Sequence, residues 1–187
     1  MNHPSPSLAQ MESDVASGSA RPNQRPTPQM LADLPQFAAV LDRQLGHCRR
    51  YGVRATVLLL TVELPAGEDA PLPAETRQAL LLAVGARLQG RVRNSDLAVQ
   101  IGAQRFGLVL MDAGRVEADV VRARLHQVLC GPYGVGEQRL HLQLRIGAAV
   151  YREAGMTGRE LVDAAENAER GADMLGTPRP QLSVARA

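Results

Sequence analysis

Apolar residues recur at helical spacing in four stretches of the chain, and each stretch predicts an amphipathic helix. These stretches cover about residues 34–51, 74–89, 115–129 and 157–175. In the first, Cys48 lies on the apolar stripe and Gly52 is placed to end the helix. The stripe of the last helix is predicted to contain Leu161, Ala165, Ala168, Ala172 and Leu175.

Other stretches have the pattern of strands. Residues 55–63 are an almost continuous apolar run, which predicts a central strand buried on both faces. Residues 97–101 and 106–111 are two short apolar runs separated by a turn, which is typical of a hairpin. Residues 140–150 alternate and predict a strand with one buried face, and residues 181–184 suit a short edge strand.

Helices and strands therefore interleave along the chain, with a tight hairpin in the middle. This order predicts an α/β fold in which a mixed central sheet is flanked by helices. Residues 1–33 are rich in Pro and Ser and are predicted to be a disordered tail. The folded domain is predicted to cover residues 34–187.

Composition narrows the functional classes. The 187 residues carry 21 basic and 19 acidic side chains and 3% aromatic residues, so a dedicated nucleic-acid binder is not expected. The unbroken apolar runs, such as residues 57–60, are too short to span a bilayer, and no secretory signal is recognisable. A cytoplasmic location without membrane insertion is expected. Neither cysteine has the spacing of a zinc ligand.

The segment VRNSDLAVQIGAQRFGLVLMD resembles the centre of the GGDEF domain, the diguanylate cyclase family. The flanking segments LDRQLGHCRRYGVRATVLLLTVE, LRIGAAVY and ELVDAAENAERGADMLG are similar to the family's first helix and strand, a later strand, and its last helix. The resemblance covers about residues 34–180 and implies a nucleotide-cyclase, palm-like sheet. It also implies a reaction that joins two GTP molecules into cyclic di-GMP with the help of divalent metals.

Several positions depart from the family pattern. The signature hairpin reads Gly102, Ala103, Gln104, Arg105 and Phe106. Both of its acidic positions are lost, and Arg105 has the opposite charge to a metal ligand. At the first strand Thr61 and Glu63 stand where the family has two aspartates, and Asp173 stands at the place of a phosphate-binding lysine. These departures predict that the chain is not an enzyme, with no catalytic residue, no bound metal and no cofactor.

A second family site is retained in part. The resemblance implies that an R-x-x-D motif before the hairpin, together with an arginine on the next helix, binds cyclic di-GMP as an inhibitory ligand. Here Arg93 and Asp96 form the motif and Arg124 occupies the helix position. An arginine can bind a phosphate or the O6/N7 edge of guanine with paired donors. The alternative is that Arg93 is an ordinary solvated arginine and that Asp96 braces the loop.

Two functional hypotheses follow. In the first, a catalytically inactive GGDEF-like domain is a receptor for cyclic di-GMP and signals to a protein partner, by self-dimerisation or within a larger complex. In the second, the domain is an interaction module that binds no nucleotide and regulates an active cyclase or a larger complex. For Arg105 a solvated turn residue is favoured over a ligand contact, and for Glu63 a strand-end carboxylate is favoured over a metal ligand.

Overall fold

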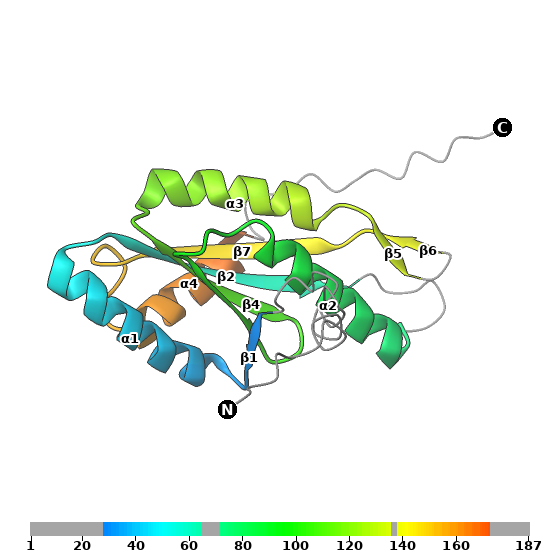
Figure 1. The fold of residues 1–187 in the computed structure, drawn as a ribbon, viewed down its shortest axis with the longest axis horizontal. Coiled ribbons are helices and arrows are strands. Elements are labelled where there is room, and N and C mark those ends of the chain that lie inside the picture. Colours follow the sequence, from blue (N-terminus) through cyan, green and yellow to red (C-terminus); the bar gives the residue numbers. More distant parts are fainter. Residues whose placement is uncertain (1–27, 65–71, 136–137, 173–187) are drawn as a thin grey trace, which may run out of the picture.

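The computed structural model describes residues 28–64, 72–135 and 138–172. Within these ranges the chain forms a five-stranded sheet, a two-stranded sheet and four helices (Figure 1). The helices are α1 (Leu34–Tyr51), α2 (Ala74–Gln89), α3 (Arg115–Leu129) and α4 (Gly158–Ala172). The strands are β1 (Gln29–Leu31), β2 (Ala55–Glu63), β3 (Leu97–Ile101), β4 (Arg105–Met111), β5 (Tyr133–Val135), β6 (Gln138–Leu140) and β7 (Gln143–Val150). The predicted mixed α/β architecture is confirmed.

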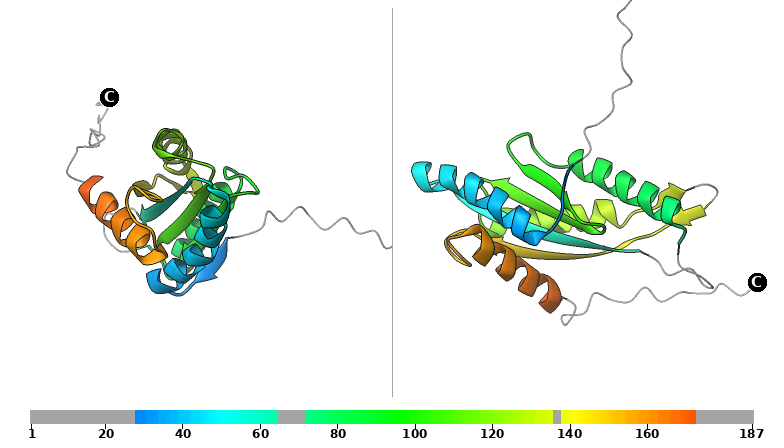
Figure 2. Two further views of the ribbon diagram at one scale, coloured as in Figure 1. Left: turned by 90° about the vertical axis from the view of Figure 1, so that its left-hand side faces the viewer. Right: turned by 90° about the horizontal axis from the view of Figure 1, so that it is seen from below.

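The large sheet has the strand order β1-β3-β4-β2-β7. Only β1 and β3 pair in parallel, and the other neighbours are antiparallel. Helices α2 and α3 pack on one face of the sheet, and α1 and α4 pack on the other (Figure 2). Because both faces are covered, the side chains of β2 are buried alternately in two cores, Leu58 and Leu60 on one side and Val57 and Leu59 on the other. This explains the continuous apolar run of β2.

Helix α1 shows how local sequence sets an element's ends. The Asp33 side chain accepts a hydrogen bond of 2.8 Å from the Gln36 N–H and caps the first turn. At the other end Gly52 adopts φ 68°, a left-handed conformation that glycine reaches without strain. Phe37, Leu41 and the predicted Cys48 are fully buried between this helix and the sheet. The predicted helix is therefore confirmed with both of its ends.

The boundary of the predicted tail needs correction. Residues 28–33 were assigned to the tail, but β1 pairs with β3 over three residues, and Pro28 is buried against Gly85 of α2. The N–H of Gly102 also donates to the Leu31 carbonyl at 2.9 Å, which ties this segment to the hairpin. Such a short edge strand is stabilised by its tertiary contacts and has little pattern of its own. The rest of the tail and the predicted strand at 181–184 lie outside the described residues.

The predicted strand at 140–150 is divided in the structure. Its first residue, Leu140, is the last residue of β6, which forms a small hairpin with β5. Residues 141–142 belong to no strand, and only β7 joins the large sheet. In addition, β7 is buried on both faces in its second half, because α4 packs closely over Gly147. The prediction of a single buried face was therefore wrong.

The buried face of α4 also differs from the prediction. Leu161 and Ala165 are buried as expected, but Ala168 is exposed and Glu169 is only 2% exposed. Oxygen Oε2 of Glu169 has no hydrogen-bond partner among the described residues. Ala172 and Leu175 were predicted on the same face, and their side chains lie outside the described ranges.

We expect acid to weaken the start of α4. The N–H groups of Met156 and Thr157 donate to Glu160 at 2.7 and 3.1 Å, and these bonds hold the pKa of that carboxyl below its ordinary value. A carboxyl with a lowered folded-state pKa stabilises the protein above its unfolded-state pKa. This contribution is lost as the pH falls through the folded-state value, because both states are then protonated.

The measurement is urea unfolding of the wild type and of Glu160→Gln between pH 7 and pH 3. The variant is expected to be less stable at pH 7, and the difference is expected to shrink as the solution becomes more acidic. Glu75→Gln in the first turn of α2 is the control, since no hydrogen bond from the described residues reaches the exposed Glu75 side chain. A difference that stays constant with pH would contradict the role of the Glu160 charge.

Candidate functional site

The hairpin between β3 and β4 turns through Gly102, Ala103 and Gln104. Gly102 adopts φ 58°, where a side chain would be strained. The carbonyl of Gln104 accepts a hydrogen bond of 2.9 Å from the Val62 N–H, which fixes the turn to the end of β2. Phe106 begins the buried part of β4 and is fully enclosed in the core. The predicted hairpin is confirmed, with β4 beginning one residue earlier at Arg105.

Ion pairs lie near the turn of this hairpin. Arg105 contacts Glu166 of α4 at 2.9 Å, and Arg170 contacts the other oxygen of the same carboxylate at 2.9 Å. On the neighbouring strands Glu63 contacts Arg145 at 2.8 Å. Arg105 is therefore neither a solvated turn residue nor free for a ligand in this structure, since it is paired with a carboxylate that is 19% exposed. Glu63 is the strand-end carboxylate that was favoured.

Thr61 lies between two of these arginines in the sheet. It is the register partner of Arg105 on one side and of Arg145 on the other. Its side-chain oxygen is buried and has no hydrogen-bond partner in the part of the chain that the structure describes. Within the same ranges, no three His, Cys, Asp or Glu side chains come together in a way that could hold a metal. The predicted absence of a metal is not tested by this observation and stays a prediction.

The R-x-x-D loop lies at the other end of β3. The carboxylate of Asp96 accepts one hydrogen bond from the Arg93 N–H at 3.1 Å and another from the Met111 N–H at 3.2 Å. The N–H of Asp96 donates to the Arg93 carbonyl at 3.0 Å, so the loop is closed on itself and tied to the end of β4. Asp96 therefore braces the loop, as the alternative interpretation expected, while the Arg93 side chain is exposed.

Helix α3 brings the third predicted residue to this loop. The guanidinium of Arg124 donates to the carbonyl of Arg91 at 3.0 Å, two residues before Arg93. The structure therefore gathers Arg93, Asp96 and Arg124 around one loop, although they come from two different parts of the sequence.

A groove of about 690 Å³ adjoins the same loop. It is lined by Arg87, Gly90, Arg91, Val128, Gly131 and Pro132, which lie at the ends of α2 and α3. Arg87 is held firmly, with its guanidinium donating to the carbonyls of Val128 and Pro132 at 3.2 and 3.1 Å and lying 3.9 Å from the centre of the Tyr133 ring. Burial raises the pKa of the Tyr133 hydroxyl, which donates to the Leu129 carbonyl at 2.9 Å.

Sequence analysis did not identify Arg87 or Arg91 as candidates. They are four residues apart, and this spacing places both on one face of α2 and its extension. This spacing is the one sequence feature that links the two arginines. It does not predict a groove, because the groove forms only where α2 contacts the segment after α3.

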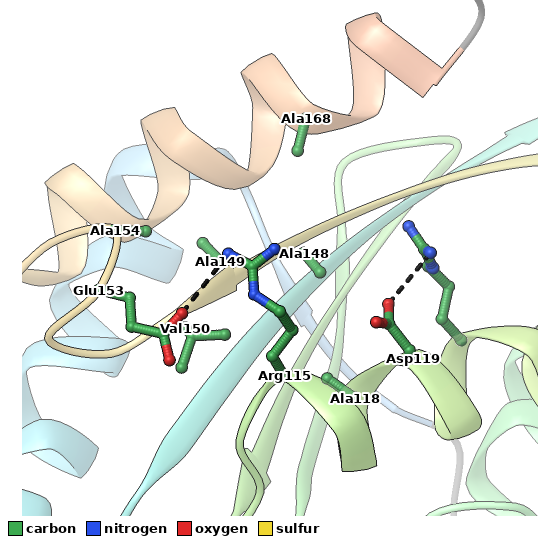
Figure 3. A pocket seen from close by; sticks show the side chains of 10 residues that line it. Arg115, Ala118, Asp119, Ala148, Ala149, Val150, Glu153, Ala154 and Ala168 are labelled. Atoms are coloured by element: carbon green, nitrogen blue, oxygen red, sulfur yellow. Dashed lines mark hydrogen bonds and ion pairs between the residues drawn. The ribbon is translucent and has the colours of Figure 1, made fainter. Parts of the chain in front are cut away.

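A second cavity, of about 340 Å³, lies between α3, α4 and the second half of β7 (Figure 3). Alanine side chains such as Ala148 and Ala168 line it, and Arg115 faces Glu153 across it at 3.5 Å. Its other arginine, Arg122, contacts Asp119 at 3.0 Å. None of the residues predicted from the sequence to bind a ligand lines this cavity.

Comparison with known proteins identifies the family. Residues 75–176 match the family model described as diguanylate cyclase, GGDEF domain. Among solved structures, the GGDEF domain of YfiN (TpbB) from Pseudomonas aeruginosa is similar at 20% identity, with a TM-score of 0.68 over 78% of this chain and 92% of that one. No curated protein matches the chain significantly.

Two further structures are informative. The GGDEF domain of DgcB from Caulobacter crescentus, solved in complex with c-di-GMP, has 14% identity and a TM-score of 0.68 over 83% of this chain and 94% of that one. The diguanylate cyclase SiaD from Pseudomonas aeruginosa, solved with its activator SiaC, has 19% identity and a TM-score of 0.65 over 90% of this chain and 64% of that one. At these identities the likeness shows a shared fold.

The family match corrects one prediction. The chain was predicted not to be an enzyme, but the family whose model it matches is that of the diguanylate cyclases. The changed residues of the hairpin were given too much weight, since they are a few positions within a match of about one hundred residues. A separate expectation concerned membranes, and within the described ranges no helix has the length and apolar character needed to cross one.

Proposed function

This chain belongs to the GGDEF domain family of diguanylate cyclases, and on that premise we propose that it binds cyclic di-GMP through Arg93, Asp96 and Arg124. The observation that carries the proposal is the contact of Arg124 with the carbonyl of Arg91, because it brings two arginines from distant parts of the chain to one loop. The complex of DgcB with c-di-GMP supports the choice of ligand.

The chemistry of the three side chains suits this ligand. Cyclic di-GMP presents two guanines and two phosphates, and an arginine can bind either group with paired donors. The Arg93 side chain has no hydrogen bond or ion pair within the described ranges, so it is free to bind. Each Asp96 oxygen accepts one backbone N–H, and a carboxylate oxygen has two lone-pair sites. Asp96 can therefore accept from a guanine N–H while it still holds the loop.

This site is separate from the hairpin. Five residues of β3 lie between Asp96 and Gly102, which at about 3.3 Å per residue places the two ends roughly 17 Å apart. Binding at the loop therefore requires no residue of the hairpin.

We also propose that the bound state is passed to a protein partner, either a second copy of the domain or another component of a complex. The complex of SiaD with its activator supports the general idea that a domain of this fold works with a partner protein. An interaction module that binds no nucleotide is the alternative, and it predicts partner binding that is indifferent to cyclic di-GMP.

Titration calorimetry with cyclic di-GMP tests the proposal. The wild type is expected to bind, and Arg93→Ala is expected to weaken binding about a hundredfold, because the lost guanidinium makes charge-assisted hydrogen bonds of about 1.5–3 kcal/mol. Arg159→Ala, at a side chain that is 88% exposed on α4, is the matched control for loss of one positive charge.

Two results would overturn the proposal. Absence of binding heat from the wild type at tens of micromolar ligand would remove the receptor function and favour the interaction module. Binding by Arg93→Ala that equals the wild type would remove the site.

A further inference from the structure

We infer that the cyclic di-GMP site extends from the R-x-x-D loop into the groove between the ends of α2 and α3, where Arg91 binds the second phosphate. The inference rests on the proposed function and adds to it a ligand-contacting residue that lies outside the R-x-x-D motif.

The groove is continuous with the R-x-x-D loop. Arg91 lines the groove, and its carbonyl is the acceptor for Arg124 of the proposed site. Val128, one helical turn after Arg124, also lines the groove. The loop site and the groove therefore share a wall, and a ligand bound by Arg93 and Arg124 has the groove beside it.

The groove carries positive charge. The groove is lined by two arginines and by no carboxylate. The nearby carboxylate of Asp96 is directed to two backbone N–H groups. This part of the surface therefore favours the binding of an anion over that of a cation.

The two arginines of the groove differ in their contacts. The Arg87 guanidinium donates to two backbone carbonyls and lies over the Tyr133 ring. It is therefore fixed in place, and it anchors the segment after α3 to α2. The side chain of Arg91 is exposed and makes no hydrogen bond or ion pair with any described residue. Its guanidinium is free to contact a ligand, while Arg124 fixes its backbone.

The ligand has the matching features. A cyclic dinucleotide carries two phosphodiester groups, and Arg93 with Arg124 can hold one phosphate and one guanine edge. The second phosphate then needs a donor on the same side of the loop, which Arg91 provides. The volume of about 690 Å³ lies within the range of about 300–1,000 Å³ that small-molecule sites occupy.

The test is calorimetric titration of cyclic di-GMP into the full chain carrying Arg91→Ala, Arg91→Lys or Arg159→Ala, at about 0.15 M salt. Arg91→Ala is expected to weaken binding about tenfold or more, because one charge-assisted contact is lost. Arg91→Lys is expected to lie between, since a lysine keeps the charge without the paired donors. Arg159→Ala is expected to bind as the wild type does.

The outcomes separate this inference from the proposed function. If Arg91→Ala binds within twofold of the wild type while Arg93→Ala does not bind, the groove is not used and the proposed function stands. If Arg159→Ala weakens binding as much as Arg91→Ala, the effect is one of net charge and the inference fails. If the wild type itself does not bind, the proposed function fails and this inference with it. Because the Arg91 side chain is exposed and makes no hydrogen bond or ion pair with the described residues, an unchanged circular dichroism spectrum of the variant is expected.

Discussion

Replacing Gly147 with alanine is expected to lower the free energy of unfolding by about 3–5 kcal/mol, the upper range for a single substitution. A Cβ atom at this position would overlap the carbonyl oxygen of Ala165 and would lie 2.5 Å from the Glu169 nitrogen. Both are backbone atoms of α4, so no side-chain rotation can relieve the clash. The helix would have to move away from the sheet and expose apolar surface that Leu161 and Ala165 now bury.

Equilibrium urea unfolding followed by circular dichroism measures this effect. Gly134→Ala is the matched control, because this glycine also lies in a strand and a Cβ there would meet no described residue within 4 Å. We expect the control to stay within about 0.5 kcal/mol of the wild type. A Gly147→Ala variant as stable as the control would mean that α4 does not pack on β7 as described.

Replacing Phe37 with alanine is expected to cost about 3–5 kcal/mol, the usual range for a fully buried phenylalanine. The Phe37 ring of α1 fills the space above Gly107 of β4, where a Cβ would lie 2.5 Å from the ring carbon Cζ. Gly107→Ala alone is therefore expected to destabilise as well, because the ring must be displaced.

A double-mutant cycle tests whether these two residues share one space. In the Phe37→Ala background the ring is absent, so Gly107→Ala is expected to cost at least about 1 kcal/mol less than it does alone. Strict additivity of the two substitutions in urea unfolding would contradict the contact. Because Gly107 lies two residues after Arg105 on β4, the cycle also tests how α1 packs on this strand of the hairpin.

The regular elements of the fold could be predicted from sequence because their patterns are strong. The apolar run of β2 and the helical stripe of α1 reflect burial that is repeated over many residues, and both elements have the predicted ends. The hairpin at Gly102 follows from turn residues between two apolar runs. In each case local preference and burial agree, so a single sequence is enough.

The short and the irregular parts could not be predicted in the same way. Strands β1, β5 and β6 have three residues each, which is too few for a period to show. The burial of Glu169 depends on the close approach of α4 to Gly147, a contact between residues more than twenty positions apart. Glu169 was not among the residues predicted to be buried, because a charged side chain is rarely enclosed.

The candidate site shows the same division. Arg93, Asp96 and Arg124 could be predicted through the family pattern, and the structure brings them to one loop. Arg87 and Arg91 could not, because their groove exists only where the segment after α3 meets the end of α2.

The length of β3 has a consequence for communication along it. In solution at about 0.15 M salt, charges are screened over about 8 Å, whereas β3 separates the R-x-x-D loop from the hairpin by roughly 17 Å. A nucleotide held by Arg93 would therefore exert only a weak direct field on Arg105 through the solvent. We expect a signal between the loop and the hairpin to be transmitted by a conformational change. The available routes are the pairing of β3 with β4 and the hydrogen bond that joins Asp96 to Met111. We therefore expect mechanical coupling through β3, rather than electrostatics, to connect the two ends of the strand.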